Sequence, residues 1–156
     1  MSKSKLLDIT LPLVPGLPRW PGNVPFSLAK RALRDENGYL RVTILRLDTH
    51  TGTHLDAPAH MHEDGATNDA IALDTLIGEA FVAEFDAPET IGPKELERAA
   101  IPPGTLRLLL KTRNSAWMSE RSPFREDFVA LSQSGAEWLI ARGIRLVGID
   151  GFSIEP

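Results

Sequence analysis

All four histidines of the chain fall within one short stretch that runs from His50 to His62. A carboxylate, Asp56, stands between the second and third of them. Histidine is the commonest metal ligand, and its pKa near neutrality suits it to general acid–base catalysis. We interpret the stretch as a metal site with a catalytic base attached. A hydrogen-bonded histidine cluster without a metal is the alternative.

The spacing of His50, His54 and Asp56 indicates how such a site is built. In an extended chain these positions of equal parity face one side, whereas the threonines and glycine between them disfavour a helix. Full extension would separate the two histidines by roughly 13 Å, so the chain must bend. Gly52 permits that bend through a bulge or a positive φ. The threonine on either side of Gly52 can hold the bent backbone with its hydroxyl group.

Two imidazoles and one carboxylate leave coordination positions open for water, as in catalytic metal sites. A divalent ion activates that water and polarises a carbonyl group, and nitrogen and oxygen ligands fit Zn²⁺ or Mn²⁺. His60 lies four residues beyond Asp56, past the stiff Pro58, and is expected to be the general acid or base. His62 is expected to lie outside the ligand set or to be exposed.

Trp20 is the other candidate functional residue. It lies in the irregular, proline-rich segment 12–25, directly before Pro21 and Gly22. A tryptophan held by such neighbours could form one wall of a ligand pocket. Covering the edge of the core is an equally good interpretation.

The segments around these residues predict one α/β domain over residues 1–156, with a mostly parallel sheet at its centre. Hydrophobic alternation and β-branched residues favour strands; we expect them at 6–13, 26–33, 40–47, 78–85, 105–111 and 144–150. Helices are expected at 92–100 and from Ser132 or Ser134 to 139, with Gly143 ending the second. The segment 113–128 is polar and is expected to be irregular.

Composition excludes several function classes. The 156 residues are 42% hydrophobic and carry a net charge of -4, and no basic block suggests a nucleic acid or membrane partner. The absence of cysteine excludes thiolate metal sites and disulfides. A charged start and the lack of a long apolar run predict a cytoplasmic protein. No glycine-rich phosphate loop or Gly-x-Ser-x-Gly motif is present.

The stretch His50-Thr-Gly-Thr-His-Leu-Asp-Ala-Pro-Ala-His60 resembles the signature of the metal-dependent cyclase/hydrolase family that includes bacterial kynurenine formamidase. The segments 8–13, 20–26, 110–113 and 148–153 resemble further landmarks of that family. The resemblance implies a swivelling β/β/α fold, a dimer or tetramer, and hydrolysis of an amide or lactam-like bond. Residue by residue, the resemblance implies that His50, His54 and Asp56 are metal ligands and that Asp56 bridges to a second ion. It makes His60 the acid/base and Trp20 a substrate contact.

The sequence departs from this family after residue 153, because the family's further histidine and glutamate ligands have no counterpart here. We therefore expect a C-terminally truncated domain or a site reduced to one metal. The expected reaction is hydrolysis of an aryl-formamide. The best candidate substrate is N-formyl-kynurenine, which would yield kynurenine and formate. A cyclase, a cyclic-amide hydrolase and an inactive metal- or ligand-binding fragment remain alternatives.

Overall fold

The computed structural model describes residues 6–86, 89–120 and 123–156. The first five residues, which bear on the expectation of no secretory signal, lie outside the described residues. The chain divides into two compact units, Met1–Leu55 and Asp56–Pro156. Each unit is described by itself.

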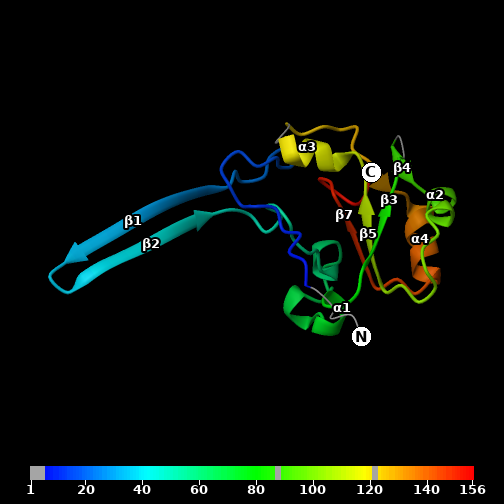
Figure 1. Cartoon of the computed structure of the whole chain (residues 1–156), viewed down its shortest axis with the longest axis horizontal. Helices are drawn as coiled ribbons and strands as arrows, with labels where there is room; N and C mark the ends of the chain where they lie inside the picture. The colour runs from blue at the N-terminus through cyan, green and yellow to red at the C-terminus, as the bar shows by residue number, and fades with distance from the viewer. Residues whose placement is uncertain (1–5, 87–88, 121–122) are drawn as a thin grey trace. The chain divides into compact units, whose positions relative to one another are not determined.

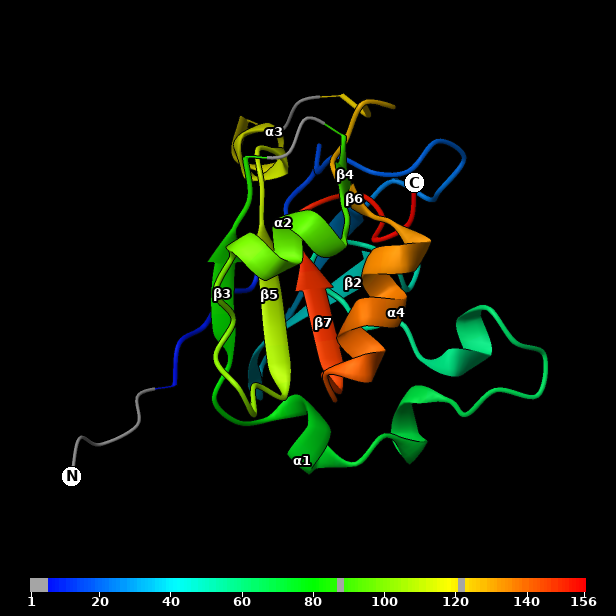
Figure 2. The ribbon, with the colours of Figure 1, turned by 90° about the vertical axis from the view of Figure 1, so that its right-hand side faces the viewer.

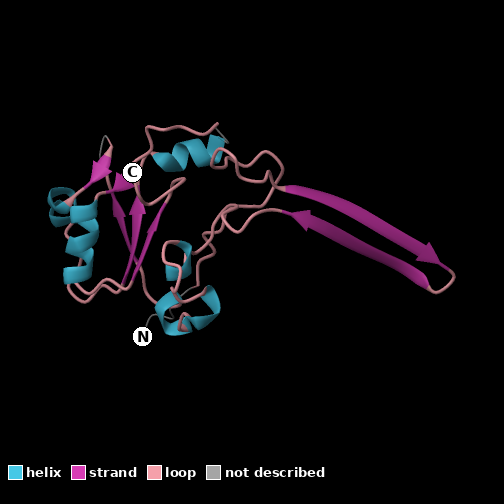
Figure 3. Cartoon of the chain, turned by 180° about the vertical axis from the view of Figure 1, so that it is seen from behind, coloured by secondary structure: helices cyan, strands magenta, loops and turns pink. Residues whose placement is uncertain are grey.

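An antiparallel hairpin is the regular structure of the first unit (Figures 1 and 3). Its strands are β1 (Ser27–Asp35) and β2 (Gly38–Arg46), and Asp35 pairs with Gly38 at the tip. The Asn37 amide donates to the Asp35 carboxylate at 2.8 Å, which closes the turn. The two strands expected at 26–33 and 40–47 are therefore confirmed, each with a small shift of its bounds.

The strand expected at 6–13 is wrong, because residues 6–14 form no regular structure. The Thr10 amide donates to the Asp8 carboxylate at 2.9 Å, a local side-chain bond that competes with strand pairing. Pro12 has no amide hydrogen for a ladder. The alternation of apolar residues alone was an insufficient signal here.

Parallel strands form the centre of the second unit. The strands β3 (Phe81–Glu84), β5 (Arg107–Lys111) and β7 (Leu146–Ile149) pair in the order β3-β5-β7. A smaller parallel pair joins β4 (Thr90–Ile91) to β6 (Ala130–Leu131). The α/β fold with a mostly parallel sheet is thus confirmed, although the short β4 and β6 were not anticipated.

Two helices, α2 (Pro93–Arg98) and α4 (Gln133–Ala141), lie on one face of the three-stranded sheet (Figure 2). Both were predicted. Ser132 caps α4 by accepting the Gly135 amide at 3.0 Å. The buried core between helices and strands contains Ala83, Phe85, Ile91, Leu96, Leu108, Leu110, Val129, Leu131 and Leu139.

Sequence reasoning missed the helix α3 (Asn114–Glu120), which lies where an irregular segment was expected. Its residues show little apolar periodicity, so its start depends on tertiary hydrogen bonds instead. The short helix α1 (Leu73–Leu76) and the 3₁₀ turns Pro58–His60 and Asn68–Ala70 were also missed. Among the described residues, no helix has the length and apolarity needed to cross a bilayer.

Candidate metal centre

Asp48 anchors the start of the histidine segment. Its Oδ1 accepts the His50 amide at 3.0 Å and the Thr51 hydroxyl at 3.3 Å, while its Oδ2 accepts the Val24 amide at 3.0 Å. This half-buried carboxylate therefore fixes the backbone of His50. Sequence reasoning missed Asp48, although an aspartate two residues before a turn residue is a known turn signal.

The chain bends at Gly52, as the spacing of the histidines predicts. Gly52 has a φ of 68°, and a Cβ at this position would lie 2.8 Å from Leu13 Cδ2. Next to it, the Thr53 hydroxyl accepts the Leu11 amide at 3.0 Å. Both a positive φ and a close neighbour therefore favour glycine. The expectation that threonine hydroxyls hold the bend is confirmed at Thr51 and Thr53.

The bend brings the rings of His50 and His54 together. His50 Nδ1 lies 3.2 Å from His54 Nε2, and the two ring planes are 88° apart. His54 Nδ1 lies 2.8 Å from the Gly52 carbonyl oxygen, which can only accept a hydrogen bond. In neutral His54 the hydrogen is therefore on Nδ1, and Nε2 keeps its lone pair.

The distance between these two nitrogens fits a shared ion. Two nitrogens, each ~2.05 Å from a tetrahedral Zn²⁺, are about 3.3 Å apart. The observed 3.2 Å between His50 Nδ1 and His54 Nε2 is close to that value. Without an ion, the same distance is a hydrogen bond between the rings. The hydrogen bond from His54 Nδ1 to a backbone carbonyl is the usual way in which proteins orient a metal-binding imidazole.

His60 lies at the end of the 3₁₀ turn Pro58–His60. The turn is held by the bond from the His60 amide to the Ala57 carbonyl at 2.9 Å, and by the bond from Ala59 to Ala66 at 3.1 Å. Gly65 packs against this turn, and a Cβ there would lie 2.4 Å from the Pro58 carbonyl carbon. The close backbone approach of Gly65 therefore supports the position of His60.

Within the continuous segment 50–60, three residues offer ligand atoms that lie within 4.8 Å of one another: His50, Asp56 and His60. His54 adjoins this group through its contact with His50. All four residues predicted for the metal and the acid/base are thus gathered locally. The grouping differs from the predicted ligand set in one respect, because it contains His60 instead of His54. His62 is exposed.

Trp20 lies in a turn that is tied to the same anchor. The Asn23 amide donates to the Trp20 carbonyl at 3.1 Å, and the next residue, Val24, donates to Asp48. The Trp20 side chain is 43% exposed. Asp48 thus connects the tryptophan loop to His50 within the first unit, which sequence reasoning did not anticipate.

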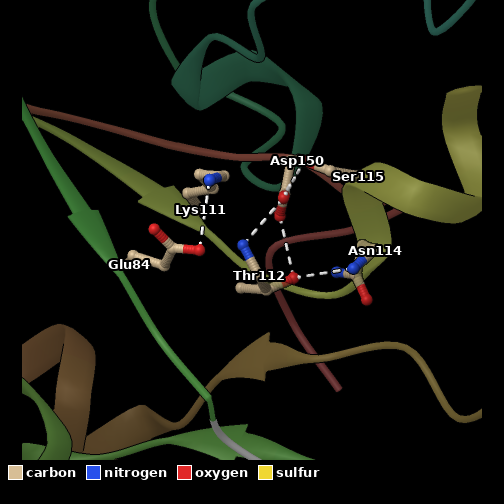
Figure 4. Close-up of polar contacts among 6 residues, drawn as sticks. All are labelled: Glu84, Lys111, Thr112, Asn114, Ser115 and Asp150. Atoms are coloured by element: carbon tan, nitrogen blue, oxygen red, sulfur yellow. Dashed lines mark hydrogen bonds and ion pairs between the residues drawn. The ribbon is translucent and has the colours of Figure 1, made fainter.

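A second polar cluster lies where the parallel strands β5 and β7 end (Figure 4). The Asp150 carboxylate accepts the Thr112 amide at 2.7 Å and the Thr112 hydroxyl at 2.8 Å, as well as the Ser115 hydroxyl. Asp150 thereby joins the end of β7 to the end of β5 and to the start of α3. These are the segments 110–113 and 148–153 that the resemblance singled out.

Asn114 extends the cluster into the core. Its side chain is fully buried; the amide nitrogen donates to the Val129 carbonyl, and the amide oxygen accepts the Val129 amide, both at 2.9 Å. The Asn114 backbone amide donates to the Thr112 hydroxyl at 3.0 Å. This network orders the strand ends and contains no metal-ligating histidine, so we interpret it as a support for the fold.

The family model and the curated relatives that match this chain agree with each other. Residues 7–156 match the model of the Cyclase family, which is described as "Putative cyclase". The chain is 36% identical to a kynurenine formamidase of Bacillus cereus over all 156 residues, which cover 73% of that protein. It is 37% identical to a kynurenine formamidase of Geobacillus thermodenitrificans over 150 residues, or 70% of that protein.

Solved structures show the same likeness. One is a potential metal-dependent hydrolase with cyclase activity, with a TM-score of 0.75 and 29% identity over 97% of this chain and 70% of that one. Another is a predicted metal-dependent hydrolase from Bacillus stearothermophilus, with a TM-score of 0.74 and 30% identity over 97% of this chain and 71% of that one.

Proposed function

Because the chain belongs to the Cyclase family, we propose that it is a metal-dependent amidohydrolase that cleaves an aryl-formamide. The names of its relatives support an amidohydrolase, and the descriptions of its structural neighbours support a metal-dependent one. The observation that carries the proposal is local to this chain: one eleven-residue segment gathers three imidazoles and a carboxylate around a bend at Gly52.

We assign the metal to His50, His54 and Asp56. The oriented Nε2 of His54 and the neighbouring Nδ1 of His50 supply two nitrogens at a spacing that suits Zn²⁺. Nitrogen and carboxylate ligands also suit Mn²⁺. A divalent ion bound there supplies an activated water and polarises the carbonyl of the substrate.

His60 is the proposed acid/base. A ring nitrogen of His60 lies within 4.8 Å of a ring nitrogen of His50 and of a carboxylate oxygen of Asp56, which is within reach through one water molecule. In the proposed reaction it accepts a proton from the attacking water and returns it to the leaving nitrogen. Transfer of that proton makes the amine a neutral leaving group and releases formate.

Trp20 is the proposed substrate contact, and N-formyl-kynurenine is the proposed substrate. A partly exposed indole offers a face on which an aryl ring stacks. The bond network through Asp48 holds the Trp20 loop and His50 to one anchor. A small molecule with an aryl group and a formamide would therefore match both features, the aryl group at Trp20 and the formamide at the histidine segment.

A second candidate function is supported by the family description and by one structural neighbour, which both name a cyclase. The same ligands can activate a carbonyl for ring closure or for opening a cyclic amide. A third candidate, a binding protein without turnover, uses the ligands but not the acid/base.

Formate release from N-formyl-kynurenine separates these candidates. We expect formate and kynurenine from the chain loaded with Zn²⁺ or Mn²⁺, loss of product after chelation, and recovery when the metal is restored. An alkyl formamide should be a poorer substrate, and Trp20→Leu should raise KM for the aryl substrate more than for the alkyl one. Turnover of a cyclic amide but not of the formamide would favour the second candidate, and metal binding without any turnover would favour the third.

A further inference from the structure

The loop that carries Trp20 is a tight turn closed by its own backbone. The Asn23 amide donates to the Trp20 carbonyl at 3.1 Å, and Gly22 between them has a φ of 89°. Proline at the second position and a positive φ at the third are typical of a type II β-turn. A Cβ at Gly22 would meet nothing within 4 Å, so the backbone conformation favours glycine here. The next residue, Val24, attaches this turn to the histidine segment.

Asp48 makes that attachment with two oxygens that have different partners. Its Oδ2 accepts the Val24 amide and its Oδ1 accepts the His50 amide, both at 3.0 Å. The Asp48 carbonyl also accepts the Thr51 amide at 3.3 Å, so Asp48 and His50 belong to one turn. The orientation of the carboxylate therefore depends on the turn that carries His50, and the bond to Val24 depends on that orientation. All of these residues lie in the first unit.

We propose that Asp48 is a positioning residue that couples metal binding at His50 to the order of the Trp20 turn, an inference that rests on the proposed function. Binding of an ion at His50 restricts the turn that contains Asp48, and a restricted carboxylate holds the Val24 amide more persistently. Ordering a segment before a second ligand arrives lowers the entropy cost of binding that ligand. The aryl group of the substrate is thus received by a turn that metal binding has already ordered.

Amide hydrogen exchange, measured by NMR on the metal-stripped chain and on the chain saturated with Zn²⁺, tests the coupling. Zn²⁺ should slow the exchange of the Val24 amide by about 5-fold or more, from the lower end of the usual coupling between two sites. The Asn37 amide is the internal control. It also donates to an aspartate, Asp35, at 2.8 Å and in the same unit, and its exchange should not respond to Zn²⁺.

Asp48→Asn separates coupling from simple support of the loop. The His50 and Val24 amides face different oxygens of the carboxylate, and an asparagine side chain has only one oxygen to accept with. In either orientation of the asparagine, Zn²⁺ should no longer change the exchange of Val24. Asp35→Asn is the matched control, because it makes the same replacement in the other turn. It should leave the effect of Zn²⁺ on Val24 unchanged.

The kinetics of Asp48→Asn test the consequence for the substrate. At saturating Zn²⁺, the variant should raise KM for the aryl-formamide by about 2–10-fold, the value of one aromatic contact. KM for an alkyl formamide should stay near that of the wild type, because the alkyl group does not need the Trp20 turn. An equal rise for both substrates would contradict the proposed role of Asp48.

Formate release, measured on the same wild-type samples, distinguishes failure of the coupling from failure of the proposed function. Slowed exchange of Val24 without formate release would support the coupling and contradict the proposed function. Formate release with equal exchange of Val24 in the presence and absence of Zn²⁺ would overturn the coupling alone. A Zn²⁺ effect that persists in Asp48→Asn, or a wild type that binds no Zn²⁺, would also overturn the coupling.

Discussion

Single residues without a role in the chemistry determine the geometry of the candidate metal centre. Asp48 fixes the backbone of His50, Gly52 makes the bend, and the Gly52 carbonyl orients His54. An imidazole that is oriented before the ion binds loses less conformational freedom on binding. The affinity of the site should therefore respond to substitutions that leave every ligand in place.

Substitution of Gly52 tests this dependence. Gly52→Ala requires a positive φ in a residue with a side chain and places a Cβ against Leu13, so metal affinity should fall about 10–100-fold, as for other supports of metal ligands. Gly52→Val should have a larger effect. The control is Gly104→Ala, since Gly104 also has a positive φ, of 80°, and has no close neighbour. Equal loss of metal in both variants, measured by titration, would assign the effect to general destabilisation.

His60 should be needed for turnover and not for metal binding. His60→Ala is expected to keep near-normal metal content and to lose about 10²–10⁴-fold in rate, the usual contribution of a positioned acid/base. His62→Ala is the control, because His62 is exposed and lies two residues away. Metal analysis and formate release on the same samples provide the measurement. Loss of the ion from His60→Ala would make His60 a ligand and refute its assignment as the base.

The sequence allowed the bend in the histidine segment to be predicted. Equal parity of His50, His54 and Asp56, together with the distance between them, required a bend, and glycine was the residue that could supply it. A turn signal was available for the local bonds of Asp48 to His50 and Thr51, but its bond to Val24 could not be predicted, because that bond depends on the fold of a distant loop. The proximity of His60 to His50 depends on a short 3₁₀ turn, which has no periodic signal in the sequence.

At the scale of secondary structure, the ends of β5 and β7 are held by buried polar groups. Asn114 makes two hydrogen bonds with the backbone of Val129, and Asp150 accepts from Thr112 and Ser115. A buried polar group that loses its partner incurs a desolvation cost. The start of α3 should therefore be among the parts of the fold most sensitive to isosteric or truncating substitutions.

Asn114→Ala is expected to lower the free energy of unfolding by about 2–4 kcal/mol, because it leaves both the amide and the carbonyl of Val129 without their partner. Chemical denaturation measures the change. Gln133→Ala, which removes an amide side chain from the exposed surface of α4, should change the stability by less than about 0.5 kcal/mol. Similar effects for the two substitutions would contradict the structural role of Asn114.

A hydrogen bond at the start of α2 makes the stability of the fold depend on pH. The backbone amide of Gly92 donates to the Glu95 carboxylate and holds the pKa of Glu95 below its usual 4.5. The ionised form is favoured in the folded state, so this stabilisation is present above the unfolded pKa and is lost as the pH falls through the folded pKa. The difference in Tm between the wild type and Glu95→Ala should therefore be largest near neutral pH and should close in acid. A difference that grows on acidification would contradict this sign.

The regular elements were predictable where hydrophobic periodicity and capping residues agreed. The strands β5 and β7 are apolar and short, and α4 begins at a serine cap. The prediction failed at 6–13, where alternation existed but Pro12 and a local aspartate bond removed the pairing. It failed again at α3, whose start is held by Asp150, some 35 positions away in the sequence.

At the scale of the whole molecule, the candidate chemistry occupies a small part of the sequence. The proposed ligands and the proposed acid/base lie in residues 50–60, while the family likeness extends over residues 7–156. This arrangement makes the central claim testable by removing one side chain at a time from that segment.

Metal content after equilibrium dialysis is the most direct test of the central claim, that His50, His54 and Asp56 bind a catalytic divalent ion. The chain is first stripped with a chelator and then dialysed against Zn²⁺ or Mn²⁺, and the bound metal is measured by mass spectrometry. We expect the wild type and His62→Ala to retain the ion, and His50→Ala, His54→Ala and Asp56→Ala each to lose it while staying folded. Retention of the ion by these three variants, or a folded wild type that binds none, would contradict the account.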